Sequence, residues 1–280
     1  MGSVASLFIT CVIPPSDDDK KLSPFGELPE SVVGSILTHL NPQDICRLAV
    51  VNKAFYGASS ADFIWDMKLP HNYQKCLVSD DIDGHVLCKK DVYAKLCGFD
   101  SVGGDTKKVW FDRTTGKPSV SISYNGLKIT NFDDRRYWSR ITTDESRFPS
   151  IAYLQQTWWL EVAGEVEFPF PVGTYNVYYR LQLGRLGKRF GWRVCNQDHI
   201  HGWDVKPVKF QLLTSDGQEA MSECYLTAPG EWISYHAGSF VVKDSKVPMK
   251  IKFSMMQIDC THTKGGLCVD SVLICPQQVL

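Results

Sequence analysis

The sequence predicts an α+β, multidomain protein, in which an all-α N-terminal part is followed by an antiparallel β-sandwich of jelly-roll-like type. Apolar residues recur at helical spacing before about residue 105, and they alternate with polar residues at strand spacing after it. No helical pattern interrupts these later segments, so the sequence lacks the alternating helices and strands of parallel sheets. About eight to ten short strands at this spacing are typical of a sandwich.

The first expected helix lies in residues 28–40, where Val33, Ile36 and Leu37 recur at helical spacing. Asn41 is expected to cap a second helix, with Pro42 at its first position. Further helical patterns follow in residues 49–70 and 88–99, and residues 100–105 read as a linker. The apolar stripe over residues 28–48 is wider than a lone helix on a small domain needs. We therefore expect a partner to cover it, either the rest of the chain or another protein.

The strand patterns begin with a hairpin over residues 109–124, which we expect to turn at Gly116. Clear alternation follows in residues 174–184, 208–213 and 249–255, and an apolar strand is expected over residues 267–274. At the start of a further strand, "WWLEVAGEVE", we expect Trp159 in the core and Trp158 on the opposite side.

The composition excludes several functional classes. The formal net charge is −1 over 280 residues, which gives no general attraction to nucleic acid or to an acidic membrane surface. No apolar run reaches the ~18 residues of a membrane span. The 10 cysteines form no CxxC pair, as expected of reduced thiols in the cytoplasm and nucleus. "MGSVAS" fits an N-myristoylation pattern at Gly2, although a plain disordered tail over residues 1–23 is the simpler expectation.

Residues 24–70 resemble an F-box, through "LPESVVGSILTHLNPQDICRLAVVNKAF" and the late Trp65. The resemblance implies that this segment docks on a Skp-type adaptor and, through it, on a cullin. Some of its apolar residues could instead form the inner core of the helices. The adaptor contacts that the resemblance implies are Leu28, Pro29, Ile36, Leu37, Leu40, Asp44 and Leu48.

Residues 107–280, behind a helical connector and linker at 71–106, resemble the phloem protein 2 family, whose fold is that of the Nictaba lectin. The segments "LKITNFDDRRYWSRI", "GTYNVYYRLQLG" and "GEWISYHAGSF" carry the resemblance. With the F-box, the chain resembles a plant F-box protein of the phloem protein 2-like A class. The resemblance implies binding of glycans that contain N-acetylglucosamine.

The stretch "NFDDRRYWSR" is the densest aromatic and charged cluster of the chain, as a sugar site needs. The lectin motif has two tryptophans in this loop, and here Trp138 stands at the second place but Asn131 at the first. Asn131 can bond a hydroxyl group but cannot stack on a sugar ring. Trp232 is the second choice of platform. The predicted carbohydrate-binding residues are Asn131, Asp133, Asp134, Arg136, Tyr137, Trp138 and Trp232.

These features favour a non-catalytic receptor subunit of a ubiquitin ligase that binds a glycoprotein client. The alternative is a receptor or scaffold that recognises a protein client and has no lectin activity, which the Asn131 position favours. A glycosidase would need two carboxylates across a cleft, and Asp133 and Asp134 are adjacent instead. Residues 195–204 carry Cys, His and Asp, and residues 260–268 carry Cys and His, but not at the spacing of zinc ligands, so no metal or cofactor is expected.

Overall fold

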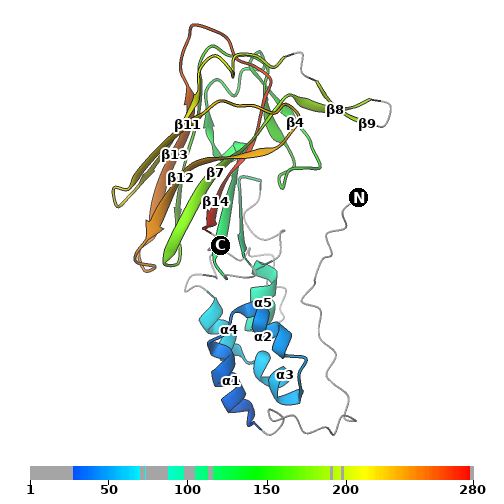
Figure 1. The fold of residues 1–280 in the computed structure, drawn as a ribbon, viewed down its shortest axis with the longest axis vertical. Coiled ribbons are helices and arrows are strands. Elements are labelled where there is room, and N and C mark those ends of the chain that lie inside the picture. The colour runs from blue at the N-terminus through cyan, green and yellow to red at the C-terminus, as the bar shows by residue number, and fades with distance from the viewer. Residues whose placement is uncertain are drawn as a thin grey trace. The chain divides into compact units, whose positions relative to one another are not determined.

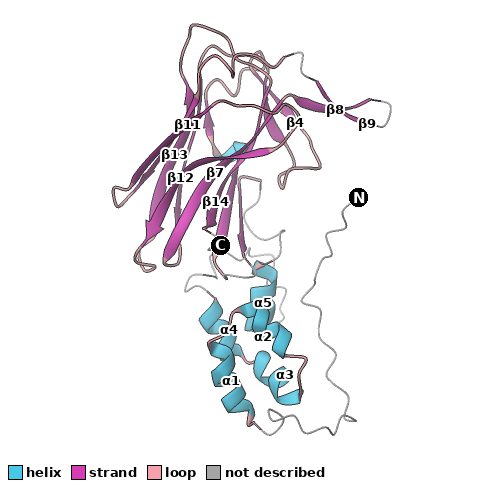
Figure 2. Ribbon diagram, in the orientation of Figure 1, coloured by secondary structure: helices cyan, strands magenta, loops and turns pink. Residues whose placement is uncertain are grey.

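The structure, a computed structural model, describes residues 28–69, 73, 88–97, 105–112, 116–189, 192–196 and 199–277. The chain divides into two compact units, residues 1–102 with 110–117, and residues 103–109 with 118–280. The described α-helices all come first, and the strands follow (Figure 1, Figure 2). This order confirms the predicted class, an all-α N-terminal part and then an antiparallel β-sandwich.

Short helices build the first unit, and a side chain caps the start of two of them. As predicted, Asn41 caps the second helix, since its Oδ1 accepts a hydrogen bond of 2.9 Å from the Asp44 N–H. Asn52 caps the third in the same way, through the Phe55 N–H at 2.9 Å. The helices are α1 (Glu30–Thr38), α2 (Pro42–Leu48), α3 (Lys53–Ser59), α4 (Asp62–Lys68) and α5 (Lys89–Leu96).

The core of the helical unit forms around Trp65 of α4, which is fully buried. Its indole Nε1 donates a hydrogen bond of 2.7 Å to the Ser59 carbonyl, so its polar atom is satisfied inside the core. Its ring lies 5.1 Å from the ring of Tyr93 on α5, measured between centroids. Val33 and Leu37 of α1 are also fully buried. No helix in the described ranges has the length and apolar character that crossing a bilayer requires.

Two large antiparallel sheets build the sandwich of the second unit, and a third sheet consists of β8 and β9 alone. One follows the order β1-β2-β14-β5-β4, with β7 beside β14 and β12 beside β7, and the other follows β11-β10-β13-β6-β3. The strands are β1 (Lys107–Phe111), β2 (Pro118–Ser123), β3 (Lys128–Ile129), β4 (Trp138–Ile141), β5 (Ile151–Leu154), β6 (Leu160–Phe168), β7 (Gly173–Leu183), β8 (Arg185–Arg189), β9 (Trp192–Asn196), β10 (Val208–Thr214), β11 (Glu219–Cys224), β12 (Ile233–Val242), β13 (Met249–Gln257) and β14 (Leu267–Pro276).

The core of the sandwich lies between the inner faces of the two sheets. Along β13, Ile251, Phe253 and Met255 are buried and alternate with more exposed polar residues, as the sequence pattern predicts. Tyr179 of β7 joins the sheets, because its hydroxyl donates a hydrogen bond of 3.0 Å to the Val162 carbonyl of β6. The central strand β14 is buried along most of its length, and it pairs with β5, which in turn pairs with β4.

Candidate functional site

Helix α1 carries apolar side chains on two sides. Val33 and Leu37 are 0% exposed and face the core, whereas Val32 and Ile36 are 44% and 43% exposed. Val32 and Ile36 lie one helical turn apart, so they form a stripe on the solvent side. Leu28 and Leu40 continue this spacing at either end and are half-buried. We call residues 28, 32, 36 and 40 the outer stripe.

The structure divides the predicted adaptor contacts into two groups. Leu28, Ile36 and Leu40 belong to the outer stripe, and Pro29 before α1 is exposed. The assignment of Leu37 as a surface contact is wrong, since Leu37 lies fully in the core of the helical unit. Helix α1 ends at Thr38, and along it a residue of the outer face is directly followed in the sequence by a residue of the inner face.

Asp44 and Leu48 of α2 are half-buried. The Asp44 carboxylate is engaged within its own helix, where it accepts a hydrogen bond of 2.6 Å from Asn41 Nδ2 and pairs with Arg47 Nη1 at 3.1 Å. This arrangement fixes the first turn of α2, and it leaves part of the carboxylate exposed.

Two exposed apolar residues of α4 were not predicted. Phe63 and Met67 are both more than half exposed and lie one helical turn apart. The Phe63 ring rests on Gly34 of α1, where an added Cβ would come within 2.9 Å of Phe63 Cζ. The spacing of Phe63 and Met67 is the sequence signal that could have identified them. Val50 and Val51, after α2, are exposed as well.

In the β unit, the predicted loop lines a cavity of about 500 Å³. We call it the turn cavity, because three of its seven lining residues belong to the turn at residues 130–137 between β3 and β4, and three more belong to the start of β4. Gln155, which follows β5, closes the wall, and its side chain donates a hydrogen bond of 3.2 Å to the Arg135 carbonyl. The lining residues are Phe132, Asp133, Arg135, Trp138, Ser139, Arg140 and Gln155.

Trp138 supports this turn from below. Its side chain is 2% exposed, and its Nε1 donates a hydrogen bond of 2.9 Å to the Thr130 carbonyl. Its ring lies 5.9 Å from the ring of Phe132, which in turn lies 5.4 Å from Tyr124. Trp138 therefore contributes to the wall of the cavity but offers no open ring face for stacking, and its position is that of a core residue.

Asn131 lies at a backbone position with φ 56°, in the left-handed region that asparagine tolerates better than tryptophan. The turn is held by the Asp134 N–H, which donates a hydrogen bond of 3.1 Å to the Asn131 carbonyl. The local backbone thus explains why an asparagine suits this place in the turn. The exposed Asn131 side chain does not line the cavity.

The other predicted residues of the turn lie outside the cavity lining. Arg136 and Asp134 form an ion pair of 2.7 Å, and this contact holds the pKa of the Asp134 carboxyl below its usual value. The Arg136 guanidinium also lies 5.6 Å from the centre of the Tyr137 ring. Of the predicted sugar-binding residues, only Asp133 and Trp138 line the turn cavity.

Trp232 lies in a different environment. Its ring is half-buried with the Arg180 guanidinium 4.5 Å from its centre, and its Nε1 donates a hydrogen bond of 2.8 Å to Glu145. Arg180 in turn pairs with the buried Asp270 at 2.5 Å. Trp232 thus covers a buried ion pair and packs beside Tyr153, and it does not contribute to the turn cavity.

Trp158 and Trp159 are exposed, by 53% and 42%. The expectation that Trp159 lies in the core is wrong, because β6 begins at Leu160 and this residue takes the inward position. The loop is held by Lys264, a fully buried residue whose ammonium donates hydrogen bonds to the carbonyls of Trp158 at 2.5 Å and Asp259 at 2.7 Å. Burial lowers the pKa of Lys264.

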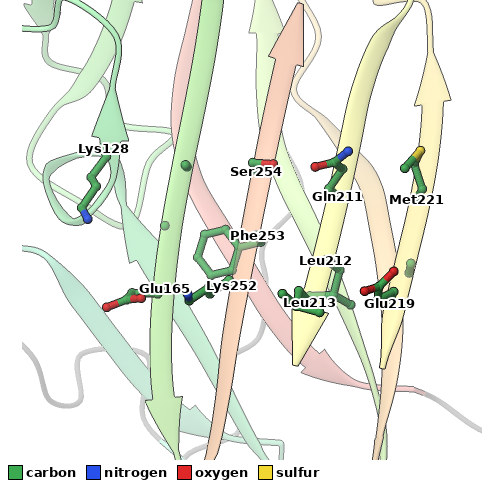
Figure 3. Close-up of a pocket in the computed structure, with 13 residues that line it drawn as sticks. Lys128, Glu165, Gln211, Leu212, Leu213, Glu219, Met221, Lys252, Phe253 and Ser254 are labelled. Atoms are coloured by element: carbon green, nitrogen blue, oxygen red, sulfur yellow. The ribbon is translucent and has the colours of Figure 1, made fainter. Parts of the chain in front are cut away.

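A second cavity, of about 620 Å³, lies on the outer face of the five-stranded sheet (Figure 3). The register aligns Gln211 of β10 with Ser254 of β13, and Ser254 with Ala163 of β6. Small side chains at the centre of this row leave a hollow, and charged residues of both signs surround it. Among them are Lys128, Glu165, Glu219 and Lys252.

In the two stretches with several Cys and His residues, two of the described histidines contact backbone carbonyls. His201 Nδ1 lies 3.0 Å from the His199 carbonyl, and His262 Nε2 lies 3.1 Å from the Gly202 carbonyl. Among the described residues, no group of three or more His, Cys, Asp or Glu side chains is placed to hold a metal ion. Gly2, the predicted lipidation site, lies outside the described residues.

Comparison with known families matches both units. Residues 25–68 match the F-box-like family, and residues 117–276 match the family of phloem protein 2. Among solved structures, the chain is similar to the Podospora anserina GH26-CBM35 β-(1,4)-mannanase, with 10% identity and a TM-score of 0.34 over 58% of this chain and 28% of that one. That likeness is too low to carry any function across.

Curated relatives share the whole arrangement. The chain is 57% identical to the F-box protein PP2-A13 of Arabidopsis thaliana over 255 residues, which are 90% of this chain and 88% of the relative. It is 53% identical to the F-box protein PP2-A11 of the same plant over 283 aligned positions, covering 99% of this chain and 97% of the relative. The chain therefore belongs to the F-box proteins of the phloem protein 2 family, in their A class.

Proposed function

We propose that this chain is the substrate receptor of a Skp–cullin–F-box ubiquitin ligase and that its β-sandwich binds carbohydrate on glycoprotein clients. The outer stripe of α1 is the observation that carries the first half of this proposal. The chain would perform no chemistry itself. It would hold the client close to the ubiquitin-loaded enzyme and so raise the effective concentration of the two.

The outer stripe supports adaptor docking on physical grounds. Val32 and Ile36 are nearly half exposed, although both sit on a helix whose opposite side already fills the core. Exposed apolar side chains at helical spacing are typical of a helix that binds a partner groove. Phe63 and Met67 of α4 add further exposed apolar surface to the same unit.

A charge placed on the outer stripe tests this docking. We expect the double variant Val32→Asp, Ile36→Asp to lose co-purification with a Skp-type adaptor, since neither carboxylate could be buried unpaired at the interface. The matched control Ser31→Asp, Ser35→Asp adds the same charge to exposed polar positions of α1. If the stripe variant folds and still binds the adaptor as tightly as the control, the docking surface lies elsewhere.

The turn cavity supports the second half of the proposal. Asp133, Ser139 and Gln155 offer carboxylate, hydroxyl and amide groups, which can bond the hydroxyl groups of a sugar. A broad glycan array with the full chain tests this function. Binding that is reduced in Asp133→Ala, and retained in Asp244→Ala on an exposed loop, would support the turn cavity as the site.

The second candidate function is a receptor that recognises a protein client and has no lectin activity. The burial of Trp138 and the asparagine at position 131 favour it, since neither residue provides an open aromatic platform. In that case the full chain would bind the adaptor but no glycan on the array. Clients would then be sought among the proteins that bind both the wild-type chain and the Val32→Asp, Ile36→Asp variant, which is expected not to bind the adaptor.

A further inference from the structure

We infer that the turn cavity selects an acidic sugar, meaning a glycan that carries a carboxylate or a sulfate group. This inference rests on the proposed carbohydrate-binding function and specifies the class of ligand. Two guanidinium groups, those of Arg135 and Arg140, line the cavity. They are the basis of the selection.

Neither guanidinium has a carboxylate partner among the described residues. Neighbouring arginines behave differently, because Arg136 pairs with Asp134 at 2.7 Å and Arg180 pairs with Asp270 at 2.5 Å. Arg140 instead lies with its guanidinium carbon 5.3 Å from the centre of the Phe132 ring. This contact orients the guanidinium but does not neutralise its charge.

The charge of the lining favours an anion. The lining contains two guanidinium groups, those of Arg135 and Arg140, and a single carboxylate, that of Asp133, so it has an excess of one positive charge. A guanidinium binds a carboxylate or a sulfate through two parallel N–H donors, and this pairing is stronger than a hydrogen bond between neutral groups. Asp133 remains available to accept hydrogen bonds from the hydroxyl groups of the same sugar.

The absence of an open ring in the lining strengthens this argument. Neutral sugars gain much of their affinity by stacking on an exposed aromatic face. Trp138 is buried, and the Phe132 ring is half-buried with Arg140 beside it. Hydrogen bonds and charge are therefore the main interactions that this wall offers a ligand.

Matched pairs of neutral and acidic sugars test the inference on the full chain. The probes are galactotriose against trigalacturonate, and N-acetylglucosamine against its 6-sulfate, measured by titration calorimetry. We expect at least one acidic probe to bind about tenfold more tightly than its neutral partner at low salt. The preference should shrink at about 0.5 M salt, because both guanidinium groups are exposed to solvent and screened.

Variants distinguish recognition by these two guanidinium groups from a general effect of positive charge on the β unit. Arg135→Gln with Arg140→Gln should remove the preference, and Arg135→Lys with Arg140→Lys should keep part of it because the charge remains. The control Lys209→Gln with Lys243→Gln removes two charges from exposed positions elsewhere on the β unit and should leave the preference intact. Thermal melting establishes that each variant is folded before its affinity is compared.

The outcomes distinguish this inference from the proposed function. Equal affinity for neutral and acidic probes, or a preference that survives in the folded Arg135→Gln, Arg140→Gln variant, would overturn the inference and leave glycan binding standing. If the full chain binds none of these probes and no glycan on the array, the carbohydrate-binding function fails, and the inference fails with it.

Discussion

Ile36 and Leu37 are neighbours on α1, and we expect them to respond to the same substitution in opposite ways. Leu37 is 0% exposed within the helical unit, whereas Ile36 is 43% exposed on the outer stripe. Changing each residue to alanine removes a similar volume of hydrocarbon. The loss should appear in folding for Leu37→Ala and in adaptor binding for Ile36→Ala.

The magnitudes follow from burial. Leu37→Ala removes a fully buried side chain and leaves a cavity, which lowers the free energy of unfolding by about 2–5 kcal/mol. Ile36→Ala removes a side chain that is only partly buried, at a cost of about 1 kcal/mol or less, part of which the better helix propensity of alanine offsets. At a docking interface, however, the same loss corresponds to about a tenfold weaker Kd or more.

Two measurements on the full chain check this contrast. Urea denaturation, followed by circular dichroism at the helical band, gives the stability of the helices. Calorimetry with the adaptor gives Kd, and it is done without urea at a temperature where both variants are folded. If folded Leu37→Ala loses more adaptor affinity than Ile36→Ala, and both are equally stable, the inner and outer faces of α1 have been assigned the wrong way round.

Other residues give three further expectations. Asn131→Trp should lower the free energy of unfolding by about 1–3 kcal/mol because of its positive φ, while Asn131→Gly should change it little, as chemical denaturation would report. Burial raises the pKa of Tyr179 well above 10.0, so the unfolded chain loses this proton first. The contribution of Tyr179 to the free energy of unfolding is complete below pH 10.0 and is lost as the pH rises above this value. Melting curves of Tyr179→Phe should therefore show a smaller loss of stability at alkaline pH than those of the wild-type chain. Asp270→Ala should cost about 3–5 kcal/mol by leaving Arg180 unpaired, whereas Arg136→Ala in an exposed pair should leave the melting temperature nearly unchanged.

The sequence alone predicted the elements whose causes are local. Asn41 followed by Pro42 indicated the start of a helix, since capping and a fixed φ depend on residues close in the chain. The alternation along residues 249–255 indicated a strand buried on one side, and the structure confirms it. The turn at residues 130–137 was predicted as the polar and aromatic loop, and it does line a cavity.

The tertiary structure decided what these elements expose. Ile36 and Leu37 look alike in the sequence, and only the packing of the other helices against α1 places one outside and the other inside. Trp138 was predicted as a platform, but contacts with Thr130 and Phe132 place it beneath the turn. Burial depends on segments that are distant in the chain, whereas helix and strand patterns depend on near neighbours.

The candidate site follows the same division. The turn that supplies Arg135 and the following segment that supplies Arg140 could be read from the sequence, but Gln155 joins them only because β5 pairs with β4 and returns the chain to this end of the sheet. Which arginines keep an uncompensated charge is likewise a matter of geometry, since Arg136 reaches Asp134 and its neighbours do not reach a carboxylate among the described residues. The sequence therefore shows which residue types the site contains, and the fold decides which of them come into contact.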